Sequence, residues 1–95
     1  MSKNNVWVYI SEDNKDCERV LNLLDKKNVP YEVKNVTKHP ENKKEMQKHG
    51  IYGTPATFIG DENNLILGYQ EEKLNLMLGV LDKNYLLNTD ADPDA

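Results

Sequence analysis

Length, composition and charge limit what this chain can be. Its 95 residues suffice for one domain with a modest core, and 38% of them are hydrophobic. The formal net charge of -4 argues against a nucleic-acid-binding protein, because phosphate binding needs a basic face. The chain has one cysteine, no long apolar stretch and no signal-peptide pattern, so we expect a monomer in a reducing cytoplasm without membrane contact.

The first half of the chain alternates strand and helix patterns. Val6–Ile10 is nearly continuously apolar, which predicts a strand buried on both faces. Residues 15–27 carry apolar side chains at helical spacing, and either Asp13 or Asn14 can cap that helix. Asn28 suits a left-handed helix end.

A second strand and a second helix follow. Residues 31–36 alternate apolar and polar side chains, which predicts a half-buried strand. Pro40 suits the first turn of a helix over about residues 40–49. Met46 is the one large apolar residue of that helix, so we expect the helix to lie lightly on the sheet.

The second half of the chain predicts a hairpin and a last helix. Residues 56–59 and 65–67 are apolar and flank a polar turn, which indicates two antiparallel strands. A helix is predicted over about residues 71–81, with Leu74, Met77, Leu78 and Leu81 on one face. The order is βαβαββα, an α/β fold with a four-stranded mixed sheet flanked by three helices. We expect one domain over residues 1–87 and an acidic, disordered tail over residues 88–95.

The single cysteine follows the first strand and begins the first helical pattern. Strand, loop, Cys-x-x-Cys and helix is the layout of a thioredoxin-like redox site. Here Asn14 stands at the first motif position and Cys17 at the second. Two hypotheses remain open, namely that Cys17 performs thiol chemistry or that it is a small core residue. His39, His49 and Cys17 lack metal-ligand spacing, so no metal site is predicted.

The local sequences in this order resemble glutaredoxins from Val6 to about Leu81. The resemblance rests on a strand tyrosine, an altered Cys-x-x-Cys motif, a leucine pair, a turn with proline, a Thr-Pro element and a glycine-aromatic segment. In this chain these are Tyr9, Asn14-Lys15-Asp16-Cys17, Leu23-Leu24, Asn28-Val29-Pro30-Tyr31, Gly53-Thr54-Pro55 and Gly68-Tyr69-Gln70.

The resemblance implies a thioredoxin-like fold and thiol–disulfide redox function, here at most monothiol through Cys17. It implies a cis peptide bond before Pro55 and a Thr54 backbone that pairs with an extended peptide such as glutathione. The candidate substrate-binding residues are Lys15, Tyr52, Thr54, Pro55, Tyr69 and Gln70. Two positions depart from the family's glutathione contacts: Ser11 replaces a lysine, and Gln70-Glu71 only partly matches an acidic pair.

Three functional hypotheses follow from these residues. The chain is either a divergent monothiol glutaredoxin acting through Cys17 or a redox-inactive module that binds a peptide or protein at the Thr54-Pro55 groove. A third hypothesis places a protein-interaction surface elsewhere, for example on the last helix. Glutathione or a protein thiol or disulfide is the expected partner, and no resident cofactor is predicted.

Overall fold

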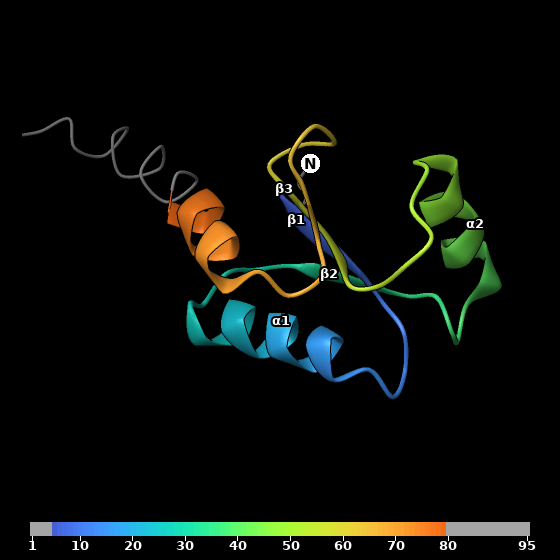
Figure 1. The fold of residues 1–95 in the computed structure, drawn as a ribbon, viewed down its shortest axis with the longest axis horizontal. Coiled ribbons are helices and arrows are strands. Elements are labelled where there is room, and N and C mark those ends of the chain that lie inside the picture. Colours follow the sequence, from blue (N-terminus) through green and yellow to red (C-terminus); the bar gives the residue numbers. More distant parts are fainter. Residues whose placement is uncertain (1–4, 80–95) are drawn as a thin grey trace, which may run out of the picture.

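The structure is a computed structural model that describes residues 5–79. Its elements in chain order are β1 (Val6–Ile10), α1 (Lys15–Lys26), β2 (Glu32–Asn35), α2 (Pro40–Lys48), β3 (Ala56–Ile59) and β4 (Leu65–Leu67). A third helix covers residues 71–79. Figure 1 shows these elements around one central sheet. The predicted order of strands and helices is confirmed, and each predicted boundary agrees to within two residues over the described range.

The four strands form one mixed sheet in the order β2-β1-β3-β4. β1 pairs with β2 in parallel, with Val8 opposite Val33. β1 pairs with β3 and β3 with β4 in antiparallel fashion. The long crossover through α1 makes the parallel pair, and the short turn after Ile59 makes the hairpin.

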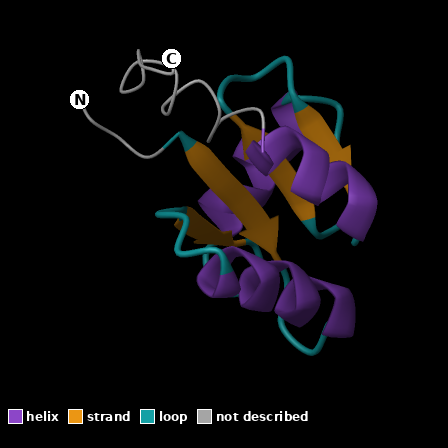
Figure 2. Ribbon diagram, turned by 90° about the vertical axis from the view of Figure 1, so that its left-hand side faces the viewer, coloured by secondary structure: helices purple, strands orange, loops and turns teal. Residues whose placement is uncertain are grey.

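Helices cover both faces of the sheet (Figures 1 and 2). α1 and the third helix pack on one face, where Val8, Leu24 and Leu74 belong to one buried cluster. α2 packs on the other face through Met46, which joins a second cluster around Phe58. β1 contributes to both clusters, which explains its continuous apolar sequence. Within residues 5–79, no helix has the length and apolar character needed to span a bilayer.

Local sequence determines how α1 begins and ends. Asn14 is extended, and its side-chain oxygen accepts a hydrogen bond from the Cys17 backbone N–H, so it is the N-cap. Asn28 has a φ of 56°, and the N–H of Val29 donates to the carbonyl of Leu24. This is a left-handed helix end of the predicted kind.

β2 is more exposed than its alternating sequence predicts. Val33 is 42% exposed, so the prediction that its strand is half-buried through this residue is wrong. β2 is an edge strand, and its neighbours cover only one side of it. The expectations for Leu81, for a domain ending at residue 87 and for a tail over residues 88–95 lie outside the described residues.

Candidate functional site

Asn14 immediately precedes α1 and lies three residues before the single cysteine, Cys17. Asn14 lies at the N-cap, and its Oδ1 atom is 3.1 Å from the backbone nitrogen of Cys17. The preceding residue, Asp13, has a φ of 59°, a conformation that aspartate tolerates better than most residues. This turn directs the chain from the loop into the helix. The asparagine amide satisfies a free helix N–H but has no nucleophilic character.

The side chain of Cys17 is buried. It lies in the first turn of α1, and only 2% of the residue is exposed. A thiol must reach a disulfide in line with its S–S bond, so a thiol closed off in this way cannot react without local opening. The nearby guanidinium of Arg19 pairs with Asp16 at 2.8 Å and is therefore already engaged.

Thr54 and Pro55 lie beside the N-terminus of α1. The Thr54–Pro55 peptide bond is cis. The Asn14 side-chain amide donates to the Thr54 carbonyl at 3.4 Å, and the Ser11 and Thr54 hydroxyls lie 2.6 Å apart. Sequence reasoning treated Ser11 only as a departure from the family and missed this contact. A hydroxyl at the end of a buried strand was the available signal.

The other predicted residues lie at varying distance from this centre. Gly68 donates its N–H to the Pro55 carbonyl at 2.8 Å, which brings the segment before the third helix to the same edge. Tyr69 is half-buried against the core cluster, and Gln70 donates to the Leu67 carbonyl at 2.6 Å. Tyr52 points to solvent with 76% of its surface exposed.

Lys15 is exposed at the first position of α1. Its side chain makes no ion pair within residues 5–79. The structure therefore brings Asn14, Thr54, Pro55 and the 68–70 segment into contact, whereas Lys15 and Tyr52 extend outward.

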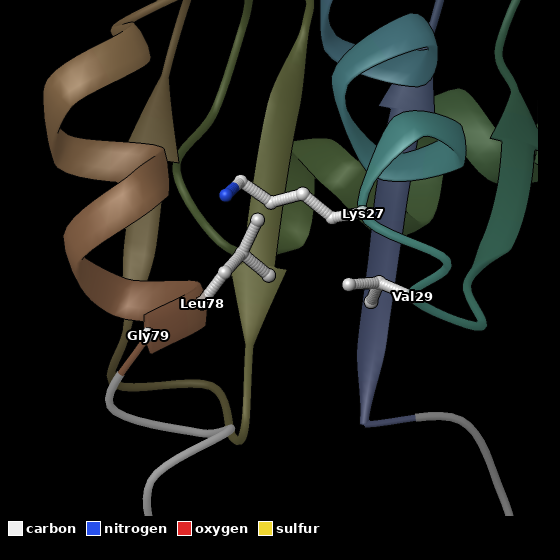
Figure 3. A pocket seen from close by; sticks show the side chains of 4 residues that line it. All are labelled: Lys27, Val29, Leu78 and Gly79. Carbon is white, nitrogen blue, oxygen red and sulfur yellow. The ribbon is translucent and has the colours of Figure 1, made fainter.

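Several cavities open on the described part of the chain, and residues of the 69–72 segment line two of them. A further cavity lies elsewhere. Figure 3 shows one of about 260 Å³ at the C-terminal end of α1, lined by Lys27, Val29, Leu78 and Gly79. None of the predicted site residues lines the cavity at the end of α1. In the described part of the chain, no three His, Cys, Asp or Glu side chains are placed to hold a metal ion.

A polar network anchors α2 to the sheet. The buried Tyr9 hydroxyl donates to the Glu45 carboxylate at 2.7 Å, and the Lys34 ammonium lies 3.1 Å from the same oxygen. Burial and the adjacent carboxylate raise the pKa of the Tyr9 hydroxyl. The hydrogen bond from Tyr9, together with Lys34, lowers the pKa of Glu45 below its ordinary value of 4.5. This network adds a polar attachment of α2 to the sheet beside the apolar contact of Met46.

We expect Tyr9→Phe to cost about 1 kcal/mol of unfolding free energy at pH 7, because a hydrogen bond to a half-exposed carboxylate is lost. The pKa of Glu45 is lowered in the folded state. The ionised carboxylate therefore stabilises the fold fully above pH 4.5, and this stabilisation is lost as the pH falls through the pKa that Glu45 has in the folded protein. Urea unfolding at pH 7 and at lower pH should therefore show the difference from wild type shrinking with acid.

Tyr31→Phe is the matched control for this prediction. Tyr31 also donates to a carboxylate, Asp25, at 2.7 Å, but that pair is exposed and joins residues only six positions apart, at the end of α1 and just before β2. Its loss should cost less than that of the Tyr9 hydroxyl. Equal costs for the two variants, or a cost at Tyr9 that is unchanged in acid, would contradict the anchoring role of Glu45.

Comparisons with known proteins agree with this architecture. The family model "Glutaredoxin" matches residues 6–63. The solved structure of the thioredoxin-like protein BC3987 has 29% sequence identity and a TM-score of 0.69, covering 76% of this chain and 97% of that one. A glutaredoxin from Archaeoglobus fulgidus has 32% identity and a TM-score of 0.68, covering 79% of this chain and 86% of that one. No curated protein matches the sequence. The family match, over more than half of the residues, and the shared fold establish that this chain belongs to the glutaredoxin family.

Proposed function

We propose that this glutaredoxin-family protein binds an extended segment of a thiol-containing partner, either glutathione or a protein, without turning over disulfides itself. The binding face is defined here as residues 11–14, 52–55 and 68–72. The single observation that carries the proposal is at the start of α1, where an asparagine cap precedes a cysteine that is only 2% exposed. Within this proposal the protein acts as a monomer in a reducing compartment, which its single cysteine supports.

The chemistry of thiol–disulfide exchange is the reason that we propose no disulfide turnover by this chain. A thiolate must attack a disulfide, and a second thiol must release the mixed disulfide that results. The Asn14 amide cannot make the first attack, and one chain with one cysteine cannot close an internal disulfide. The family's dithiol cycle is therefore not available to this chain.

The backbone at Thr54 supports the binding part of the proposal. No backbone carbonyl of residues 5–79 accepts a hydrogen bond from the Thr54 N–H. An extended peptide can accept that bond and add a short strand-like pairing. Ser11 and Asn14 hold the side chain and carbonyl of Thr54, so the donor is presented in a fixed position.

A monothiol reaction through Cys17 is the second candidate. Its specific support is the place of Cys17 in the first turn of α1, at the second position of the motif that the family resemblance implies. In this candidate the thiol forms a mixed disulfide with glutathione, and a second glutathione releases it. Burial of the Cys17 side chain counts against this candidate. The two candidates predict different results for Cys17→Ser, because this change abolishes mixed-disulfide reduction only if Cys17 is the reacting thiol.

The binding proposal is tested by titrating isotope-labelled protein with reduced glutathione and with an uncharged hexapeptide, and following amide shifts by NMR. We expect the largest shifts at Thr54 and in the 11–14 loop. Tyr52→Ala should weaken peptide binding about tenfold, because an exposed aromatic contact is lost.

Leu76→Ala is the matched control, since Leu76 is also apolar and 65% exposed but lies on the third helix. It should leave binding unchanged. The same samples are assayed for glutathione-dependent reduction of a mixed disulfide, where wild type and Cys17→Ser should be equally inactive. Reduction by wild type that Cys17→Ser abolishes would replace this proposal with the monothiol candidate.

A further inference from the structure

Carboxylates flank the binding face on two sides. Glu12 and Asp13 lie in the loop before Asn14, and Glu71 and Glu72 begin the third helix. All four are exposed, and none makes an ion pair within residues 5–79. Glu12 accepts a hydrogen bond from the Asn35 side-chain amide. Because this amide is neutral, the negative charge of Glu12 is not balanced.

Three contacts connect these flanking segments to Thr54 and Pro55. The loop reaches Thr54 through the Asn14 amide and the Ser11 hydroxyl. The segment before the third helix reaches Pro55 through the Gly68 N–H. Lys15 is an exposed cation beside the first flank, and Lys26 and Lys73 line cavities together with Glu71. Arg19 also lies there but pairs with Asp16, so the four carboxylates still outnumber the free cations that the described residues place beside them.

The centre of the face offers groups that suit a protein segment. The Thr54 N–H is a backbone donor with no backbone acceptor in the described residues. Tyr52 leaves 76% of its surface exposed and gives this face an aromatic contact for an apolar side chain. An occupant that matches these groups has an extended backbone, an apolar side chain and cations on both sides.

We infer that the binding face takes an extended protein segment that carries lysine or arginine, in preference to glutathione. This inference rests on the proposed function, because it names the partner of the same face. Glutathione has two carboxylates and a net negative charge at pH 7, so both flanks repel it. A basic segment is attracted by the flanks and docks its backbone at Thr54.

Two dye-labelled hexapeptides test the inference by fluorescence anisotropy. They share a central apolar pair and differ in having lysines or glutamates on either side. We expect the lysine peptide to bind at least about tenfold more tightly at low salt. The ratio should approach one near 1 M salt, where the Debye length falls to about 3 Å. Reduced glutathione, followed by NMR, should bind more weakly than the lysine peptide.

Matched variants show whether the flank charges are responsible. Glu71→Gln with Glu72→Gln should lower the lysine preference about threefold or more. Glu41→Gln with Glu62→Gln changes net charge equally, but these exposed residues lie on α2 and in the β3–β4 turn, so the preference should persist.

The outcomes separate this inference from the proposed function. If the glutamate peptide binds as tightly as the lysine peptide, or if the two variant pairs act alike, the inference is overturned while binding at Thr54 stands. If neither peptide binds and no amide near Thr54 shifts, the proposed function fails and the inference fails with it.

Discussion

Asn14→Cys is expected to give this protein thiol–disulfide exchange through a thiol at position 14. The new thiol would lie at the N-cap of α1, beside the Cys17 N–H that now donates to the asparagine. Thiols at helix N-termini have pKa values of about 3.5–7.5, against about 8.5 for a free cysteine. At pH 7 we therefore expect alkylation of the variant to be at least about tenfold faster than that of a free thiol. Oxidised glutathione should convert it to an internal disulfide with Cys17.

Two control variants make this result specific. Asn14→Ser keeps a capping oxygen without a thiol and should stay inactive. Asn14→Cys combined with Cys17→Ser should stop at a mixed disulfide with glutathione, which mass spectrometry detects. Loss of the asparagine cap should cost about 1 kcal/mol of stability, and urea unfolding checks that each variant is folded. A folded Asn14→Cys variant that reacts no faster than a free thiol would show that position 14 is not the nucleophile position of this fold.

Cys17 in the wild type is expected to be protected from alkylation. With 2% of the residue exposed, the reagent reaches the thiol only when α1 opens. A domain with an unfolding free energy of about 5 kcal/mol populates its open state in fewer than about one molecule in a thousand. We expect iodoacetamide to modify the native protein at least about 100-fold more slowly than the urea-unfolded protein at the same pH.

Leu24→Ala provides the control for that protection. Leu24 is fully buried on the same helix, and its truncation should cost about 2–5 kcal/mol. Alkylation of Cys17 should accelerate in this variant if opening limits the reaction. Native and unfolded rates within about tenfold of each other would mean an accessible thiol, and the monothiol candidate would then take precedence over the binding module.

Much of the fold followed from local patterns in the sequence. The continuous apolar run Val6–Ile10 indicated a strand buried on both faces, and the two clusters that share β1 confirm it. The sequence offered Asp13 or Asn14 as the N-cap of α1 and Asn28 as its left-handed end, because capping and left-handed turns depend on the residue itself. The structure selects Asn14 as the cap and confirms Asn28. These predictions needed only chemistry within a few residues.

Contacts between residues far apart in the sequence could not be predicted from local patterns. The Tyr9–Glu45 hydrogen bond joins residues 36 positions apart, and the Asn14–Thr54 bond joins residues 40 positions apart. A polar helix such as α2 gives little sign of which carboxylate it turns toward the sheet. Val33 fits an alternating strand, yet its exposure depends on β2 being at the sheet edge.

The sequence by itself determined the order of elements, the family and the position of the single cysteine, since each is a matter of residue type and spacing. The tertiary structure alone decided that Cys17 is buried and that Ser11 and Asn14 hold Thr54. Burial and hydrogen-bond partners depend on which surfaces the chain brings together after it folds, and local periodicity does not encode that information.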